Sequence, residues 1–291
     1  MSPSTRPLTE LRNPRSRGLD RLAARDIVAL IHREDASVPA AVARVGTATA
    51  RAADLIAHRL REGGRLWLVG AGTSGRLAVL EAAECSPTFG TPRSLVRAVI
   101  AGGSRAVTRS VEGAEDDQEA GAVAMKPVRP GDAVIGIAAS GVTPFVRAAL
   151  AEARRRGART VFLSCSPAKK LADIHITPRV GPEVIAGSTR LKAGTATKLI
   201  LNAITVAVMT RLGKVHDNLM VDVRPTNAKL RDRARRIVRE LTGKDPGPAL
   251  ASAGWRVKTA VVMLKLGVEA REAERRLAAK RGNLRGALEE R

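Results

Sequence analysis

The chain has 291 residues, of which 44% are hydrophobic and 27% charged, which is typical of a soluble globular protein. It has no apolar N-terminal segment of signal-peptide type, and its longest apolar run, residues 199–209, is too short to span a bilayer. The net charge of +22 is typical of nucleic-acid-binding proteins, but only 2% of residues are aromatic and the arginines are scattered among alanines, as on solvated helix faces. We therefore expect a cytoplasmic protein, neither exported nor membrane-anchored, whose positive field attracts small anionic substrates more than nucleic acid.

The first predicted elements are helices. Apolar residues recur at helical spacing over residues 21–62, and Gly63 and Gly64 end this region. Apolar runs then alternate with helical segments, a pattern that indicates βαβ units and a mainly parallel sheet. Five strands are predicted, at residues 65–69, 95–102, 133–140, 159–166 and 174–178.

Helical segments are predicted between the later strands and after the last one. Residues 111–125 are expected to contain a loop and a helix, and residues 143–157 form the helix after the third strand. A long helix is predicted near 189–213, and the tail at 249–290 has the length of three short helices. The expected architecture is a doubly wound five-stranded α/β domain at 56–219, with an N-terminal helical segment at 1–55 and a helical region at 220–291.

Three loops rich in glycine and hydroxyl residues follow the first, third and fourth strands. They are Gly-Ala-Gly-Thr-Ser-Gly at 70–75, Ala-Ser-Gly-Val-Thr-Pro at 139–144 and Ser-Cys-Ser-Pro at 164–167. Ligands of doubly wound sheets bind at the carboxyl ends of the strands, where backbone N–H groups and helix N-termini favour anions. The loops therefore predict a phosphate site, with candidate contacts from Thr73, Ser74, Ser140, Gly141 and Thr143.

A dinucleotide site is the alternative interpretation of the first loop. Residues 70–75 match G-x-G-x-x-G, but this match is weak when it stands alone. The second strand ends in Ala101, Gly102 and Gly103 where a dinucleotide fold expects an acidic residue. No Gly-Lys-Ser/Thr sequence is present, which excludes a P-loop.

Three glutamates are candidates for acid–base work or sugar contact: Glu84, Glu115 and Glu183. Glu84 has small or apolar neighbours, and an apolar environment keeps a carboxyl group protonated, as a general acid requires. A second, ionised carboxylate then serves as the base. The four histidines and two cysteines have no metal-ligand spacing, so we expect no metal, and we interpret Cys85 and Cys165 as buried thiols.

The sequence resembles the N-acetylmuramic acid 6-phosphate etherases of the sugar isomerase (SIS) superfamily. The resemblance covers nearly the whole chain and rests on long motifs: TELRNP at 9–14, GAGTSGRLAVLEAAECSPTFG at 70–90, VEGAEDD at 111–117, AASGVTP at 138–144, GPEVIAGSTRLKAGTATKLILN at 181–202 and KVHDNLMVDVRPTNAKL at 214–230. Glucokinase regulatory protein is a longer relative with two SIS modules, and 291 residues have room for only one.

The resemblance implies a single SIS domain, preceded by helices and followed by a small tail similar to ubiquitin-associated domains. It implies a homodimer with sites near the subunit interface, and no cofactor or metal. The implied activity cleaves the lactyl ether of N-acetylmuramic acid 6-phosphate to N-acetylglucosamine 6-phosphate and D-lactate.

Family roles transfer to individual residues through these motifs. The proton donor falls on Glu84, the second active-site glutamate on Glu115, and the phosphate-binding hydroxyls on Ser74, Ser140 and Thr143. Glu183 is a further candidate for the sugar end of the substrate, and Lys192 for the anion.

The chain departs from the family pattern at Val142 and Phe145, where Arg and Tyr are expected in many relatives. Both positions flank the second phosphate loop, so they concern substrate contacts and not the reaction. Two other functions fit the same loops: a sugar-phosphate isomerase, and a non-catalytic phosphosugar sensor. The sensor needs no carboxylates, so the presence of Glu84 and Glu115 within matching motifs favours catalysis.

Overall fold

The computed structural model describes residues 6–289, which divide by their contacts into two units. The first unit contains the chain up to Ala82 together with Ser94–Thr205, and the second contains Ala83–Arg93 together with the chain from Val206 onward. The first unit therefore includes the N-terminal helices as well as the sheet. The expected three-part division at 1–55, 56–219 and 220–291 stays a prediction.

The first unit is built on a five-stranded sheet of order β2-β1-β3-β4-β5, in which every pair is parallel. Its strands are β1 (Leu66–Gly70), β2 (Val96–Ile100), β3 (Ala133–Ile137), β4 (Arg159–Leu163) and β5 (Ile174–Ile176). All residues of β1 and β3 are buried, because a parallel sheet is covered by helices on both faces. The doubly wound, five-stranded fold expected from the sequence is confirmed, and each predicted strand is present.

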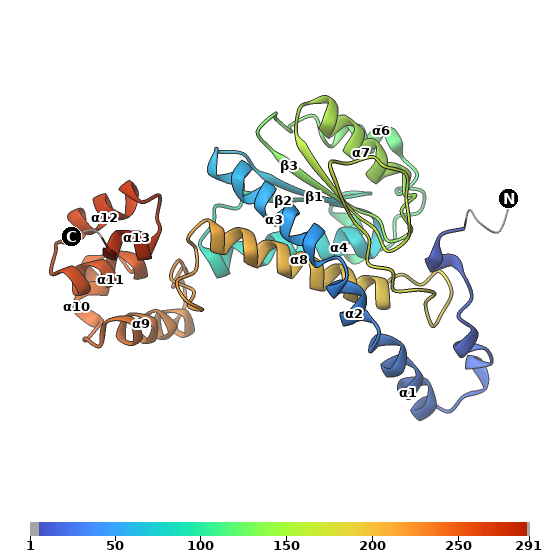
Figure 1. Ribbon diagram of the computed structural model, residues 1–291, viewed down its shortest axis with the longest axis horizontal. Helices are drawn as coiled ribbons and strands as arrows, with labels where there is room; N and C mark the ends of the chain where they lie inside the picture. Colours follow the sequence, from blue (N-terminus) through green and yellow to red (C-terminus); the bar gives the residue numbers. More distant parts are fainter. Residues whose placement is uncertain (1–5, 290–291) are drawn as a thin grey trace. The chain divides into compact units, whose positions relative to one another are not determined.

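Helices cover the two faces of this sheet (Figure 1). On one face α6 (Gln118–Val123) and α7 (Pro144–Arg155) pack on a core that includes Val69, Val134 and Phe162. The other face is covered by α3 (Gly46–Arg61), α4 (Gly72–Phe89) and α8 (Lys192–Arg211). From residue 6 onward the unit also contains 3₁₀ turns at Leu8–Glu10, Pro14–Ser16 and Leu19–Arg21, and the helices α1 (Ala24–Asp35), α2 (Val38–Ala43) and the short α5 (Arg105–Thr108).

A buried polar network ties the N-terminal segment to the start of α8. Glu34 of α1 accepts hydrogen bonds from Lys192 Nζ (2.7 Å), Asn13 Nδ2 (2.7 Å) and Arg15 Nη1 (2.8 Å). Although burial opposes it, these three donors hold the pKa of Glu34 below its ordinary value. Asn13 also donates to the carbonyl of Pro182, so the N-terminal motif fixes the segment that leads into α8.

Helix α8 is long and apolar enough to cross a membrane by length and composition alone. Half of its most apolar window is buried, and its two lysines, Lys192 and Lys198, form ion pairs with Glu34 and Glu81. These contacts are those of a core helix in a soluble protein. The expectation that the apolar run is too short to span holds for residues 199–209, but the helix that contains them is longer.

The second unit is helical and has its own core. It contains α9 (Ala228–Thr242), α10 (Gly247–Ser252), α11 (Val257–Leu266), α12 (Ala270–Ala279) and α13 (Leu284–Glu289). Up to residue 289 the tail thus has four short helices where the sequence predicts three. Val238, Leu250 and Val261 are at the centre of the core. The final turns of α4 pack here, since a Cβ at Gly90 would lie 2.2 Å from the carbonyl oxygen of Asp222.

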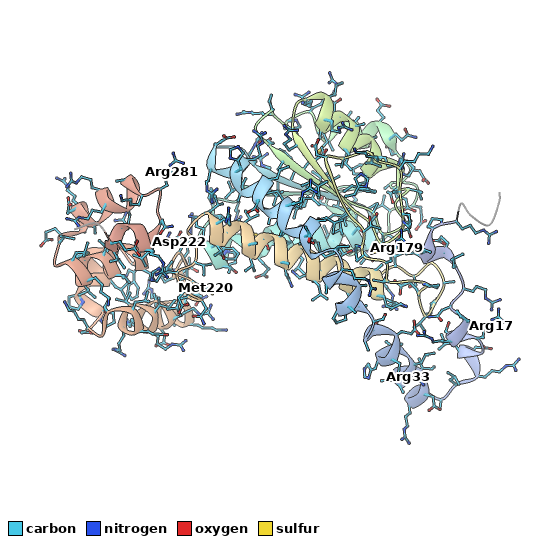
Figure 2. All side chains as sticks on the ribbon, in the orientation of Figure 1. Arg17, Arg33, Arg179, Met220, Asp222 and Arg281 are labelled. Atoms are coloured by element: carbon cyan, nitrogen blue, oxygen red, sulfur yellow. The ribbon has the colours of Figure 1, made fainter. Side chains whose placement is uncertain are left out.

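Exposed arginines carry much of the positive charge. Arg17, Arg33 and Arg281 are all exposed (Figure 2). Several others pair with carboxylates on the same helix, such as Arg155 with Glu152.

Candidate functional site

The hydroxyl-rich loops leave the sheet at one edge. Gly70, Ile137 and Leu163, the last residues of β1, β3 and β4, lie opposite one another in register. The chain passes from β1 outward to β2 and then returns to β3 on the other side of β1, so the strand order reverses between β1 and β3. Doubly wound sheets bind ligands at this kind of switch point, and here the loops at 71–75 and 138–144 flank it.

The first loop is tightly packed and leads directly into α4. A Cβ at Gly75 would lie 2.5 Å from Ile100 Cγ1 and 2.8 Å from the carbonyl oxygen of Gly70, so only glycine fits there. Thr73 and Ser74 lie in the first turn of α4 and are partly exposed. Their hydroxyls and the first N–H groups of the helix are therefore available to an anion at this end.

The second loop leads into α7. Gly141 has a φ of +79°, a left-handed conformation that glycine adopts without strain. Ser140 Oγ accepts a hydrogen bond from the N–H of Val142 at 3.4 Å. Thr143 is the N-cap residue of α7, yet its side chain makes no capping hydrogen bond, which leaves its hydroxyl available to a ligand.

The two residues that depart from the family pattern occupy different environments in this loop. Val142 is exposed at the tip of the loop, whereas Phe145 is 3% exposed and belongs to the core beneath α6 and α7. Phe145 therefore contributes packing, and Val142 alone presents its side chain to solvent.

Glu115 lies beside the first loop. It lines a pocket of about 230 Å³ together with Ala71, Gly72 and Arg76. Its carbonyl accepts the N–H of Phe145 at 3.0 Å, which fixes the acidic loop against the start of α7. The fold thus brings Glu115 to the switch point, although it is far from β1 in the sequence.

Arg76 is a residue of this pocket that the sequence reasoning missed. Its guanidinium, on the first turns of α4, donates to the carbonyls of Val107 (3.0 Å) and Arg109 (3.0 Å). It therefore fixes the segment that precedes the acidic loop. The signal was its position directly after the Gly-rich loop, inside the first motif.

Glu84 lies on α4, in the second unit, and its side chain is exposed. The expectation that its neighbours bury it is wrong for the single chain, because Ala83 and Pro87 are exposed as well. Among the residues from 6 to 289, those that line the pocket of Glu115 do not include Glu84.

Glu183 is fully buried, and its position does not support contact with a sugar. Its two carboxylate oxygens accept the N–H groups of Lys192 (3.0 Å) and Ala193 (2.9 Å), which caps the start of α8. Burial raises the pKa of Glu183, against these two donors, which favour its ionised form. Lys192 is likewise buried in its ion pair with Glu34, so it is neither a surface lysine nor available to an anion.

Neither cysteine forms a disulfide, and both are buried, as expected. Burial raises the pKa of the Cys165 thiol to about 12, and the neighbouring Glu183 adds to this effect. His175 is a structural residue, since its Nε2 accepts the N–H groups of Leu171 and Ala172. Within residues 6–289 no cluster of three or more His, Cys, Asp or Glu side chains is arranged to hold a metal ion.

Glu81, three residues before Glu84 on α4, is another residue that the sequence did not single out. It is 5% exposed, and it accepts hydrogen bonds from Lys198 Nζ and Thr205 Oγ1, both at 2.5 Å. Because its partners come from α8, Glu81 joins α4 to α8. The regular spacing of Glu81 and Glu84 along one helix gave no indication of which of them is buried.

The sequence of the chain matches known SIS-domain proteins. Residues 48–154 match the model of the glucokinase regulatory protein N-terminal SIS domain, and residues 108–207 match the SIS domain model. A protein of Rubrobacter xylanophilus named N-acetylmuramic acid 6-phosphate etherase is 54% identical, over 97% of this chain and 96% of its own length. One of the same name from Nostoc punctiforme is 50% identical, over 97% of this chain and 94% of its own length. The solved structure of a phosphoheptose isomerase from Neisseria gonorrhoeae is 18% identical with a TM-score of 0.48, over 65% of this chain and 100% of that one.

Proposed function

The chain belongs to the N-acetylmuramic acid 6-phosphate etherase family, and we propose that it hydrolyses the D-lactyl ether of N-acetylmuramic acid 6-phosphate. The products are N-acetylglucosamine 6-phosphate and D-lactate, and the enzyme is a carbon–oxygen lyase that works in the cytoplasm. The observation that carries this proposal is the match to curated etherases over almost the whole length of both chains. A match of that extent includes the acidic loop and α4 as well as the phosphate loops.

The phosphate group binds at the switch point of the sheet. Its ligands are the hydroxyls of Ser74, Ser140 and Thr143, with Thr73 completing the site. Gly141 provides the turn of the second loop, since its N–H already donates to the carbonyl of Ala138 at 2.9 Å. Support comes from the partial exposure of the four hydroxyl side chains and from the helix N-termini that both loops enter. Binding energy at this end orients the distant reacting carbons.

The reaction proceeds by elimination followed by addition. The open-chain sugar has an aldehyde at C1, which acidifies the proton on C2. Glu115 removes this proton, the electrons form a C2–C3 double bond, and the bond from C3 to the lactate oxygen breaks. Glu84 gives its proton to the departing oxygen, so D-lactate leaves as the alcohol.

The second half replaces lactate by water. A water molecule adds to C3 of the unsaturated aldehyde while its proton goes to the ionised Glu84. The protonated Glu115 returns a proton to C2, and both carboxyl groups regain their starting states. The position of Glu115 beside the first phosphate loop supports its role as the base.

The working molecule is a homodimer. The solvent-facing residues of α8 from Thr195 to Thr210 form one uncharged stripe: Thr195, Leu199, Asn202, Ala203, Val206 and Thr210. In a chain with a net charge of +22, an uncharged apolar face is where two copies can meet without repulsion between arginines. Leu80 is also exposed, on the helix α4 that Glu81 joins to α8, and a second copy on this surface would shield Glu84 from solvent.

The test is turnover of N-acetylmuramic acid 6-phosphate in ¹⁸O-labelled water, followed by lactate assay and mass spectrometry. We expect free D-lactate and one labelled oxygen at C3 of the product sugar. Glu115→Gln and Glu84→Gln should each lower kcat by about 10²–10⁴-fold, since each removes one positioned acid–base group. Ser140→Ala should mainly raise KM, because it removes a contact made equally in the ground and transition states.

Three results would contradict parts of this proposal. Absence of lactate excludes the etherase, and a ketose product would indicate an isomerase. Wild-type rates in Glu84→Gln or Glu115→Gln would remove that residue from the mechanism. Glu119→Gln, an exposed glutamate on α6, is the matched control and should keep the wild-type rate.

A further inference from the structure

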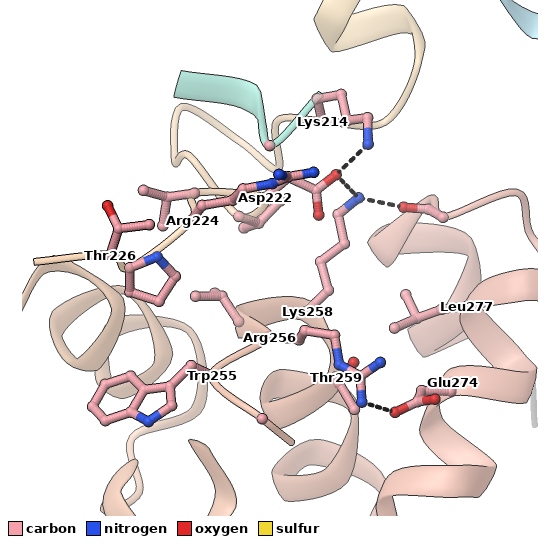
Figure 3. Close-up of a pocket in the computed structure, with 17 residues that line it drawn as sticks. Lys214, Asp222, Arg224, Thr226, Trp255, Arg256, Lys258, Thr259, Glu274 and Leu277 are labelled. Atoms are coloured by element: carbon pink, nitrogen blue, oxygen red, sulfur yellow. Dashed lines mark hydrogen bonds and ion pairs between the residues drawn. The ribbon is translucent and has the colours of Figure 1, made fainter. Parts of the chain in front are cut away.

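The second unit contains a pocket of about 590 Å³ that the reaction does not use (Figure 3). Its size is within the range of small-molecule sites. Four cationic side chains line it, against two carboxylates: Lys214, Arg224, Arg256 and Lys258, with Asp222 and Glu274. The lining therefore has two positive charges in excess.

One wall of the pocket is a shared ion pair. Asp222 accepts from Lys214 at 2.9 Å and from Lys258 at 2.7 Å, so a single carboxylate serves two ammonium groups. Lys258 also donates to the carbonyl of Gly282 at 2.7 Å, and its side chain is only 8% exposed. Burial lowers the pKa of Lys258 while Asp222 opposes this effect, and a bound anion would further stabilise the charged form.

The lining also includes a further ion pair and an arginine whose side chain has no partner within residues 6–289 (Figure 3). Arg256 pairs with Glu274. The side chain of Arg224 is exposed and makes no hydrogen bond or ion pair with any residue in the range 6–289. All five N–H donors of the Arg224 guanidinium are therefore available to a ligand.

Trp255 lies at the edge of the pocket in an unusual backbone conformation, with a φ of +63°. Non-glycine residues in this region are strained, and such strain gathers at functional sites. The guanidinium groups of Arg231 and Arg235 lie over its ring, 5.3 and 5.1 Å from the centroid. The ring is thus engaged with cations, which favours a ligand that has no aromatic ring of its own.

We propose that this pocket binds a small phosphomonoester of about the size of a hexose phosphate. A phosphate dianion matches the two excess positive charges, and Arg224 supplies the fork that phosphate oxygens prefer. Val223, Val257 and Leu277 form an apolar wall for the carbon skeleton. The inference does not rest on the proposed function, because every residue of this site belongs to the second unit.

The experiment uses Trp255 as the reporter in the full-length chain. The chain has two tryptophans, so Trp67→Phe leaves Trp255 as the only indole. This variant is titrated with glucose 6-phosphate, with inorganic phosphate and with glucose, while Trp255 emission is recorded. We expect a saturable change with glucose 6-phosphate, weaker binding of inorganic phosphate, and no change with glucose.

Three further substitutions in this background locate the site. Arg224→Gln should raise the Kd for glucose 6-phosphate about tenfold, since it removes a charge-assisted contact. Lys265→Gln removes the same charge from the far end of α11 and should leave the Kd unchanged. Ser140→Ala should also leave it unchanged, because Ser140 belongs to the phosphate loops of the sheet.

Several results would overturn the proposal. They are no emission change up to millimolar glucose 6-phosphate, an equal effect of Arg224→Gln and Lys265→Gln, or loss of the response in Ser140→Ala. Equal affinity for inorganic phosphate and glucose 6-phosphate would also overturn it, because the apolar wall would then contribute nothing.

Discussion

At the scale of single residues, the carboxylates of the first unit differ in how many donors they have and how much solvent reaches them. Glu34, Glu81 and Glu183 are buried, and each accepts at least two hydrogen bonds from the protein. Glu115 is exposed beside a pocket. A carboxylate whose oxygens are already engaged holds the structure together, whereas one that faces solvent can exchange a proton with a substrate.

The two lysines of α8 provide a test of this distinction. Lys192→Met leaves buried Glu34 without its closest ammonium partner and should lower the free energy of unfolding by about 3–5 kcal/mol. Lys198→Met should lower the free energy of unfolding by less, because the Lys198 side chain is 32% exposed and water can replace part of its interaction with Glu81. Urea denaturation followed by circular dichroism measures both, and an equal cost for the two substitutions would contradict the role assigned to burial.

At the scale of secondary-structure elements, one aspartate joins the starts of β1 and β3. Asp132 accepts from the backbone N–H of Arg65 (2.9 Å), from Trp67 Nε1 (2.9 Å) and from Arg65 Nη2 (2.9 Å). Although burial opposes it, these donors hold the pKa of Asp132 below its ordinary value. The side chain therefore fixes the register at the end of the sheet opposite to the loops that are proposed to bind phosphate.

Asp132 makes stability depend on pH in a defined direction. Because its folded pKa lies below the unfolded value of 3.8, its contribution is fully present above that pH and is lost as pH falls through the folded pKa. Asp132→Asn should lower the free energy of unfolding at pH 7 by about 3 kcal/mol, since Arg65 then loses its ionised partner. The difference between wild type and variant should shrink below about pH 4 in urea titrations, and a constant difference would exclude this linkage.

The starts of the helices are the elements that shape the site. α4 and α7 begin with loops whose hydroxyls are available to a ligand, whereas α8 begins with a cap supplied by Glu183. When a carboxylate already accepts the first N–H groups of a helix, few free backbone donors remain there to bind a phosphate. This explains why Glu183 stabilises the fold by capping α8, although its sequence motif resembles a binding site.

At the scale of the whole molecule, the uncharged stripe on α8 contrasts with the net charge of +22. Leu199 is 39% exposed on that stripe. If two copies meet there, Leu199→Arg places a charge in the contact and should convert a dimer into a monomer, with loss of etherase activity. Val28→Arg, which adds the same charge at an exposed apolar position of α1, should leave the dimer intact.

Light scattering coupled to size-exclusion chromatography decides this prediction. A dimer for wild type and Val28→Arg, with a monomer for Leu199→Arg, is the expected set of masses. A monomeric wild type that still releases D-lactate would remove the dimer from the proposed function.

Local sequence determined much of this protein. The five strands, the helices between them and the three hydroxyl loops were predictable, because periodicity and glycine content depend on neighbouring residues alone. The family was also predictable, since its motifs are contiguous in the chain. The prediction that Glu115 and the phosphate loops belong to one site rested on the resemblance and the parallel sheet. The pocket lined by Glu115 includes Ala71 and Gly72 of the first loop but no residue of the second, so for the second loop it stays a prediction.

Tertiary structure decided what each charged side chain does. Glu183 and Lys192 are residue types that often occur in binding sites, but both are buried. Glu183 caps the start of α8, and Lys192 pairs with Glu34. Glu84 has small or apolar neighbours in sequence but is exposed, because Ala83 and Pro87 on the same part of α4 are exposed as well and do not cover it. Burial depends on segments far apart in the chain, here Asn13, Glu34 and Lys192, and so no local pattern could reveal it.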